Sequence, residues 1–345
     1  MKIFSLRLSP IFLLLCACFM PTQMLAQDDT DTIKVEPRTR KSGNIVLVGE
    51  VPNVRAFAVF GGPITGGDHY GEMVKSFKEE FGPQVNVYSM IIPTASAYYT
   101  TEKAKEWCKD QHPIICHMYE AMGDSVIPVD IYDTLQAHKD EPIYLRTDHH
   151  WAPLAAYYAA KCFAKVAGVP FRGISQYNRQ VVRNFVGTMP MYAKDSSVKR
   201  SPEDFVYYTP KDSDYTATFV TYTLGRDRKT VIKSSAPHEE PFFKSYKDGS
   251  SGAYCTFMGG DTRTVKVNTV VHNGRRLLIL KDSYGNAIPG YLFGSFEEIH
   301  VADFRYFTHV AKYVRDNHIT DVLFANNISH AYARGTTTRY EKILK

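Results

Sequence analysis

The sequence is poor in several features that mark particular classes of protein. It has only two Trp and six Cys in 345 residues, and no CxxC pair, so a structural zinc site is not predicted. It lacks a dominant charge, since the formal net charge is +5, which is too weak to indicate a nucleic-acid partner. After residue 26 no apolar run approaches membrane-spanning length. In contrast, 23 Tyr and 20 Phe are present, and such side chains suit core packing and amphipathic ligands such as carbohydrate.

The first 26 residues have the pattern of a secretory signal. Lys2 and Arg7 precede an apolar run at 11–20, and small residues precede Gln27. We predict a signal peptide over residues 1–26, and without its two basic residues the net charge falls from +5 to +3. An alternative is a lipoprotein box that would leave a lipid on Cys18. Both versions predict an exported protein, periplasmic or extracellular, with no transmembrane segment in the mature chain.

Four cysteines follow the predicted signal peptide, namely Cys108, Cys116, Cys162 and Cys255. Cys108 and Cys116 are near enough in sequence to pair in an oxidising compartment. Pro113 and the helical pattern before it leave that pairing open.

The rest of the chain has the alternation of strand and helix patterns that is typical of an α/β fold. Residues 27–42 are polar and are predicted to be a flexible lead-in, and residues 43–345 are predicted to form one domain. Short apolar runs at 45–48, 56–60, 85–92 and 277–280 alternate with segments of helical spacing, which predicts a parallel sheet covered on both faces. Between about 172 and 272 the helical spacing disappears and Tyr/Thr/Val runs alternate with turn residues. This range predicts a β-rich insertion, a small antiparallel subdomain beside the sheet.

Two separated segments carry candidate chemistry. Asp148 and His150 are two residues apart, so in an extended segment both side chains project from the same face. Ser283 follows the apolar run 277–280 at a predicted helix start, where free amides favour negative charge. A serine esterase needs a hydroxyl, a histidine base and a carboxylate that orients the base. We therefore predict Ser283, His150 and Asp148 as a catalytic triad.

Other interpretations of these residues are simpler. Ser283 can be a helix cap and the histidines surface residues. A metal site could combine Asp148, His149 and His150 with Asp68, His69 or His330, but adjacent residues rarely bind one ion and no HExxH motif is present, so no metal is predicted. A literal Gly123-Asp124-Ser125 matches the nucleophile signature of the SGNH hydrolases, but it precedes a strand and is interpreted as a turn.

Several motifs together resemble the DHHW protein family. They are Tyr144-Leu145-Arg146-Thr147-Asp148-His149-His150-Trp151, Ala155 with Tyr157-Tyr158, Leu277 to Ala287 around Lys281-Asp282-Ser283, Asp303-Phe304-Arg305-Tyr306, and Asp321-Val322-Leu323-Phe324. The family resembles the SGNH-hydrolase-like domains of alginate O-acetylation proteins, in which the Asp-x-His element precedes the serine. The resemblance implies a three-layer SGNH-like fold with permuted motif order. It also implies that Ser283 is the nucleophile, His150 the base and Asp148 the orienting acid.

Further site residues follow from the mechanism that the resemblance implies. Oxyanion donors are the Ser283 amide and, as side-chain candidates, Asn326 or Asn327. Tyr284 and Arg146 are candidates for substrate contact. Lys281 stands where the SGNH signature has Gly, so the local turn is expected to differ.

The resulting hypothesis is an exported O-acetyl esterase or O-acetyltransferase acting on a cell-envelope or extracellular polysaccharide, without a cofactor. Its expected partners are an acetylated or acetyl-accepting glycan and a membrane acetyl-donor protein. Two alternatives stay open. One is a non-catalytic carbohydrate-binding or scaffold protein of the envelope, and the other is a metal-dependent hydrolase.

Overall fold

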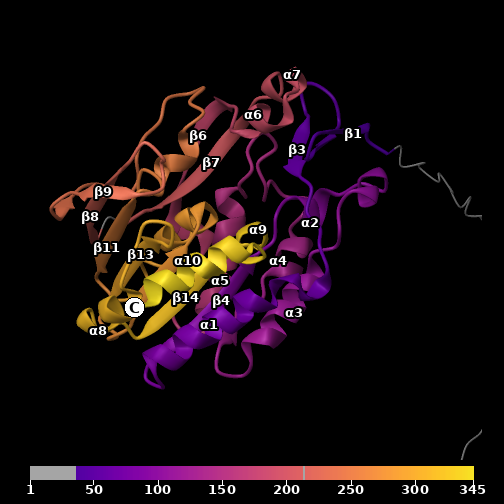
Figure 1. Ribbon diagram of the computed structural model, residues 1–345. Coiled ribbons are helices and arrows are strands. Elements are labelled where there is room, and N and C mark those ends of the chain that lie inside the picture. The colour runs from indigo at the N-terminus through magenta and orange to yellow at the C-terminus, as the bar shows by residue number, and fades with distance from the viewer. Residues whose placement is uncertain (1–35, 213) are drawn as a thin grey trace, which may run out of the picture. The chain divides into compact units, whose positions relative to one another are not determined.

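A mixed nine-stranded sheet runs through the middle of the protein (Figure 1). The computed structural model describes residues 36–212 and 214–345. The strands of this sheet are β4 (Asn86–Ile92), β5 (Ile127–Pro128), β8 (Tyr215–Leu224), β9 (Val231–Ser234), β10 (His238–Glu239), β11 (Arg263–Thr269), β12 (Arg276–Lys281), β13 (Glu298–Asp303) and β14 (Asp321–Asn327). Their order is β10-β8-β11-β13-β12-β14-β4-β5, with β9 paired to β8.

The part of the sheet from β13 to β5 is parallel. Within it, the next two strands along the chain after β12, namely β13 and β14, lie on opposite sides of β12. The connections that leave β12 and β13 therefore diverge, and a crevice opens at the carboxyl ends of the strands. Because Ser283 lies two residues beyond β12, the topology places it at that crevice.

Helices cover both faces of the parallel strands. Alternate residues of β12 belong to different cores, since Leu277 and Ile279 pack in one with α5 (Pro153–Ala167), and Leu278 and Leu280 pack in the other with α1 (Asp68–Phe81). This division confirms the predicted three-layer α/β architecture with a mostly parallel sheet. The longer helices are α1 (Asp68–Phe81), α3 (His112–Met122), α5 (Pro153–Ala167), α8 (Val310–Asp316) and α10 (Arg334–Leu344). The shorter ones are α2 (Ser96–Tyr99), α4 (Tyr132–Ala137), α6 (Met189–Ala193), α7 (Ser196–Lys199) and α9 (Ile328–Ala331).

The first apolar runs do not join this sheet, contrary to the expectation. A separate antiparallel sheet is formed by β1 (Thr39–Ser42), β2 (Ile45–Val48) and β3 (Arg55–Ala58). Its inward side chains, such as Leu47, pack against Met189 of α6 and Val198 of α7. A run of apolar residues predicts a buried strand but does not identify its partner.

The predicted N-terminal segments are only partly within the described residues. The predicted signal peptide, 1–26, lies outside them, as do residues 27–35 of the predicted lead-in. Residues 39–42 of that lead-in form β1, so regular structure begins earlier than expected.

The predicted β-rich insertion, about 172–272, is divided between two places. β6 (Tyr177–Phe185) and β7 (Glu203–Pro210) form a separate antiparallel pair. β11 instead pairs with β13 and β8 pairs with β11, so the later part extends the central sheet with antiparallel strands. β11 pairs with the edge of β13 that lies away from β12, and Phe219 and Val265 are buried in the same core as α5. The expectation of a subdomain beside the sheet was therefore wrong for β8 to β11.

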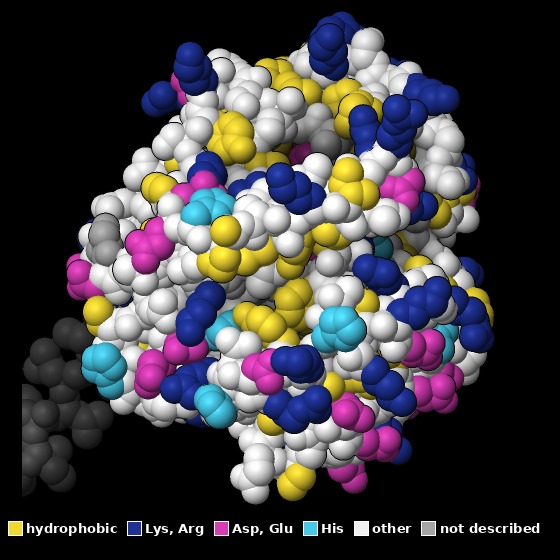
Figure 2. Space-filling view, turned by 60° about the vertical axis from the view of Figure 1, so that its left-hand side comes forward, with side chains coloured by type: hydrophobic (Ala, Val, Ile, Leu, Met, Phe, Trp, Pro, Cys, Tyr) yellow, Lys and Arg dark blue, Asp and Glu magenta, His cyan; other side chains and the backbone are white. Residues whose placement is uncertain are grey.

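The surface has no single dominant charge on the face drawn in Figure 2, where acidic and basic side chains are interspersed around a band of hydrophobic ones. Among the described residues, no helix combines the length and the apolar character needed to cross a membrane. The four cysteines in this part of the chain, including Cys108 and Cys116, are unpaired.

Candidate active site

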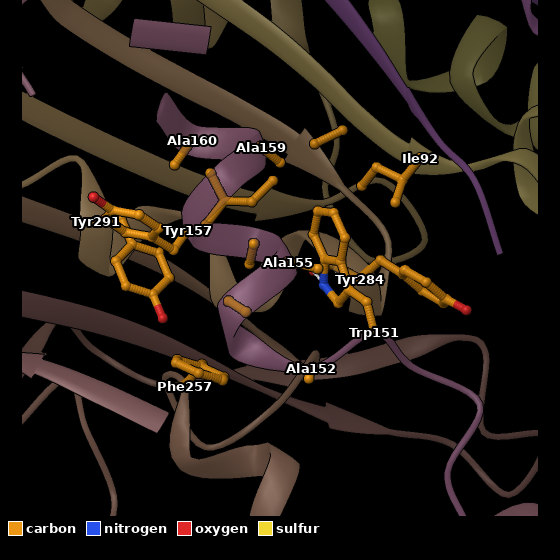
Figure 3. Close-up of a cluster of buried hydrophobic side chains, with 14 of the residues drawn as sticks. Ile92, Trp151, Ala152, Ala155, Tyr157, Ala159, Ala160, Phe257, Tyr284 and Tyr291 are labelled. Carbon is orange, nitrogen blue, oxygen red and sulfur yellow. Dashed lines mark hydrogen bonds between the residues drawn. The ribbon is translucent and has the colours of Figure 1, made fainter. Parts of the chain in front are cut away.

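The segment that carries Asp148 and His150 is a bend rather than an extended strand. An isolated bridge pairs Tyr144 with Trp151 and closes the loop between them. Trp151 is fully buried, and its indole donates to the Tyr284 carbonyl at 2.9 Å, which joins this loop to the turn after β12 (Figure 3). The extended geometry predicted for this segment was wrong. Asp148 meets His150 instead because its carboxylate accepts the His150 amide at 3.1 Å, as in an Asx turn.

The three residues predicted as a triad form one hydrogen-bonded chain. His150 Nδ1 lies 2.6 Å from Asp148 Oδ1, and His150 Nε2 lies 2.8 Å from Ser283 Oγ. The serine is 133 positions beyond the histidine, and it is half-buried whereas the other two are buried. The His150 ring is stacked on Tyr254 with centroids 3.8 Å apart. These distances are within the range that proton transfer between a hydroxyl and a base requires.

Asp148 is held from a second direction by Thr188. Its Oδ2 accepts the Thr188 amide at 2.8 Å and the Thr188 hydroxyl at 3.0 Å. Burial by itself would raise the pKa of this carboxyl, but His150, His149 and the Thr188 amide outweigh it and hold the pKa well below its usual range. Asp148 is therefore an ionised carboxylate that fixes the imidazole.

His149 lies beside this chain and has a different environment. Its Nδ1 is 2.6 Å from Thr188 Oγ1, and its ring centroid is 3.8 Å from that of His150. Burial and the neighbouring His150 lower the pKa of His149 to about 4. The ring is therefore neutral near pH 7.

Ser283 lies at the start of a short 3-10 helix, η5 (Ser283–Ala287), whose N-cap is Asp282. The fully buried Asp282 accepts the Tyr284 amide at 2.9 Å, the Asn327 amide at 2.8 Å and His330 Nδ1 at 2.9 Å. Burial opposes ionisation, but these donors, His330 first among them, lower the pKa of Asp282. Burial also opposes the charge on His330, yet its bond to Asp282 raises the pKa of His330. This second acid–imidazole pair anchors the turn that presents Ser283.

An ionic cluster lies beneath the same turn. Buried Lys281 donates to Asp303 at 2.9 Å and to Asp261 at 3.3 Å, and Arg305 pairs with both acids at 2.7 and 2.8 Å. Lys281 stands where the SGNH signature has glycine, and its buried side chain lies within this ionic cluster. A residue there can therefore be large and charged without obstructing Ser283.

A pocket of about 400 Å³ opens at Ser283, and its lining is of mixed polarity. The apolar lining residues are Ile45, Ala56, Phe57, Ala58, Ala95, Met189 and Tyr192. The polar ones include Thr94, Arg305, Asn327, Ser329 and His330. Asp148, His149, Ser283 and Tyr284 line it as well. A small ester on an amphipathic molecule would find both kinds of surface here.

Of the other predicted site residues, two line the pocket and two do not. Asn327 and Tyr284 line the pocket, but the Asn327 amide group donates to Asp282 at 2.9 Å and the Tyr284 hydroxyl donates to the His149 carbonyl. Asn326 is buried on the side of α1 and α10, and its carbonyl accepts two tyrosine hydroxyls. The Arg146 guanidinium points to the Pro52 and Pro202 carbonyls. Neither Asn326 nor Arg146 lines the pocket, so their predicted contacts with substrate have no support in this geometry.

The remaining sequence candidates lie elsewhere or are already hydrogen-bonded. Asp124 and Ser125 are in an exposed turn before β5, as the turn interpretation predicted. Asp148, His149 and His150 each offer a ligand atom within 4.8 Å of the others, but both Asp148 oxygens already accept hydrogen bonds. His69 bonds Thr337 at 2.6 Å instead of joining that group.

Several residues of the site were not found from the sequence. The Asp282–His330 pair had a weak signal, since Asp282 precedes Ser283 and Asn327 is three residues before His330, a spacing typical of a helix cap. The side chain of Asn327 does accept the His330 amide at 3.1 Å. Thr188 and Tyr254 had no such signal, because both lie in the range 172–272 and reach the site only through the fold.

Comparisons with known proteins identify the family. Residues 21–302 match the model of the DHHW protein family. The chain is also similar to the crystal structure of a DHHW family protein from Eubacterium siraeum, with 37% identity over 90% of this chain and 99% of that one and a TM-score of 0.80. The protein therefore belongs to the DHHW family, as its motifs indicated.

More distant structures share the fold. The structure of Bacillus cereus PatB1 is 18% identical, over 84% of this chain and 97% of that one, with a TM-score of 0.67. PatB1 with a sulfonyl adduct is also 18% identical, over 85% and 96%, with a TM-score of 0.64. No curated protein matches the chain.

Proposed function

We propose that this DHHW protein is an exported serine-dependent acyltransferase or esterase that acts on O-acetyl groups of a cell-envelope or extracellular polysaccharide. The observation that carries the proposal is the continuous chain from Asp148 through His150 to Ser283 at the pocket. An ionised acid on one imidazole nitrogen and a hydroxyl on the other are what nucleophilic acyl transfer by serine requires.

Each residue has a defined part in the proposed reaction. Ser283 Oγ attacks the ester carbonyl while His150 Nε2 takes its proton, and Asp148 stabilises the imidazolium that forms. His150 then protonates the leaving alcohol, which leaves an acyl-serine. The Ser283 amide is the proposed oxyanion donor, because a first-turn amide has no acceptor within its own helix. Water or a sugar hydroxyl completes the reaction, giving hydrolysis or transfer.

The polysaccharide assignment is supported by the mixed lining of the pocket. A sugar has an apolar face of C–H groups and a polar rim of hydroxyls, and the pocket offers both apolar and polar side chains. Tyr192, which lines the pocket, is 57% exposed, so an aromatic ring is available for a sugar face. The export of the protein and a membrane acetyl-donor partner remain predictions from the sequence.

Labelling with a fluorophosphonate probe tests the proposal directly. We expect the wild type to be labelled, and Ser283→Ala and His150→Ala to lose labelling while they stay folded. Ser125→Ala, in the Gly123-Asp124-Ser125 triplet, serves as the matched control and should keep it. A folded but unlabelled wild type would favour the non-catalytic carbohydrate-binding alternative. Esterase activity that a chelator abolishes and zinc restores would favour the metal-dependent one.

A further inference from the structure

The hydrogen bonds of His149 determine which of its nitrogens carries the hydrogen. Asp148 is a carboxylate and has no hydrogen to give, so the Thr188 hydroxyl donates its only one to Asp148 Oδ2 at 3.0 Å. The same hydroxyl oxygen lies 2.6 Å from His149 Nδ1. With that hydrogen given to Asp148, the hydroxyl accepts from His149, which assigns the hydrogen to Nδ1. In the neutral ring Nε2 then has a free lone pair.

This lone pair faces open space rather than a protein donor. His149 lines the pocket together with Ser283, and its side chain is 38% exposed. Within residues 36–212 and 214–345, no donor is hydrogen-bonded to its Nε2. The burial that lowers the pKa of His149 to about 4 keeps the ring an acceptor near neutral pH. A neutral acceptor thus lies one ring away from the proposed base, with the two centroids 3.8 Å apart.

The Nε2 atoms of the two adjacent imidazoles, His149 and His150, can each accept a hydrogen from one of two adjacent hydroxyls. We propose that His149 Nε2 accepts a hydrogen bond from the hydroxyl next to the one that attacks the acyl-serine, so that the site selects a vicinal diol of a sugar as acyl acceptor. His149 is then a specificity-determining residue, and this inference rests on the proposed function. Tyr192 supports the sugar as occupant, because its ring packs edge-on against His149 at 6.3 Å and forms the adjoining wall.

The transfer step is balanced without another reactant. The attacking hydroxyl oxygen bonds to the acyl carbon and its proton passes to His150 Nε2. The bond from the acyl carbon to Ser283 Oγ then breaks, and His150 returns the proton to Ser283. The neighbouring hydroxyl keeps its own proton throughout and donates it to His149. Its bond orients the acceptor without taking part in the chemistry.

The test compares two acceptors that differ by one hydroxyl. Acyl transfer from p-nitrophenyl acetate to propane-1,2-diol and to propan-1-ol is measured beside hydrolysis in the same reaction. The variant His149→Asn can keep a donor near the Nδ1 position for Thr188 while it removes the acceptor at Nε2. His149→Gln, whose longer amide reaches toward the Nε2 position, serves as the rescue variant.

We expect the wild type to prefer the diol and the preference to fall about three- to tenfold in His149→Asn, the effect of one neutral hydrogen bond. His149→Gln should recover part of it. Transfer and hydrolysis start from the same acyl-serine, so their ratio is insensitive to changes in acylation. A wild type that does not prefer the diol, or equal losses for both acceptors and for water in His149→Asn, would overturn the inference.

Two further readouts separate the inference from the proposed function. The ¹⁵N NMR spectrum of the imidazoles reports the tautomer of His149, and a hydrogen on Nε2 near pH 7 would contradict the inference even in an active enzyme. A folded wild type that neither releases p-nitrophenol nor labels at Ser283 would instead overturn the proposed function and the inference with it.

Discussion

Two aspartate–histidine pairs lie on either side of Ser283, and they differ in what the imidazole reaches. In the first pair His150 continues from Asp148 to Ser283 Oγ at 2.8 Å. In the second, His330 binds Asp282 at 2.9 Å, and Asp282 also accepts the backbone amides of Tyr284 and Asn327 and the side-chain amide of Asn327. An aspartate and a histidine thus have different roles in the two pairs. Both acids accept backbone amides, so the pairs differ in whether the second imidazole nitrogen meets a nucleophile, as that of His150 does at Ser283.

The first prediction removes the charge of the first pair and has the largest expected effect. Asp148→Asn should lower kcat/KM for p-nitrophenyl acetate by about 10⁴-fold, because a neutral amide neither stabilises the imidazolium nor holds the required tautomer. Steady-state kinetics and thermal unfolding of the same sample provide the measurement. If activity instead stayed within tenfold of the wild type, the first pair would not be the general-base system.

The second prediction displaces the Asp148 carboxylate without substituting Asp148 itself. A Cβ added at Gly187 would lie 2.3 Å from both Cβ and Oδ2 of Asp148, far inside contact distance, so the carboxylate must shift from His150. Gly187→Ala should therefore lower kcat/KM by about 10²-fold, as expected for a misplacement of about 1 Å. Gly173→Ala is the matched control, because its added Cβ would meet only Ser175 Oγ at 3.8 Å. Equal activity in both variants would contradict the prediction.

The third prediction concerns the second pair, Asp282 and His330, whose disruption should lower the stability of the folded protein. Asp282→Asn places an amide donor among groups that are themselves donors, so the free energy of unfolding should fall by about 3 kcal/mol. Urea unfolding measures it. Asp316→Asn, in an exposed ion pair with Lys312, should change stability little. A stable Asp282→Asn variant would show that the buried acid is not needed to hold the turn.

The fourth prediction is the smallest and concerns the pH dependence of that stability. The pKa of His330 is raised in the folded protein, so the folded state binds this proton more tightly than the unfolded state does. The stabilisation is complete below the ordinary histidine pKa of about 6.5 and is lost as pH rises through the higher folded pKa. The difference in unfolding free energy between wild type and His330→Gln should therefore be larger at pH 6 than at pH 9. Because His330 is partly exposed, we expect less than about 1 kcal/mol. A difference that does not vary with pH would argue against the charged pair.

Local sequence patterns predicted several of the helices and strands. The apolar run before Ser283 predicted β12, and Pro153 and Gly168 marked the two ends of the helix now seen as α5. Such signals are visible in the sequence because they depend on neighbours in the chain, namely a missing amide at the first turn and a left-handed residue at the last. The pairing of strands had no comparable signal, which is why β2 and β3 were assigned to the wrong sheet.

The residues of the site likewise include some that could be proposed from the sequence and some that could not. Asp148, His150 and Ser283 could be proposed from the sequence because their residue types and flanking segments are those of acyl transfer. Thr188 could not, since nothing around it differs from an ordinary turn, yet it holds Asp148 and lies 2.6 Å from His149 Nδ1. Asn326 and Asn327 were indistinguishable in sequence, but successive side chains of β14 face opposite sides of the sheet, so only Asn327 reaches the pocket.

The sequence by itself determined the elements, the family and the residue types of the candidate chemistry, because these follow from short-range spacing and composition. Only the tertiary structure decided that β12 lies between β13 and β14, and so that a crevice opens over Ser283. It also brought the His150 imidazole to the Ser283 hydroxyl and gave His149 and His330 other partners. This arrangement depends on hydrogen bonds between residues far apart in the chain, which form only once the sheet has been assembled.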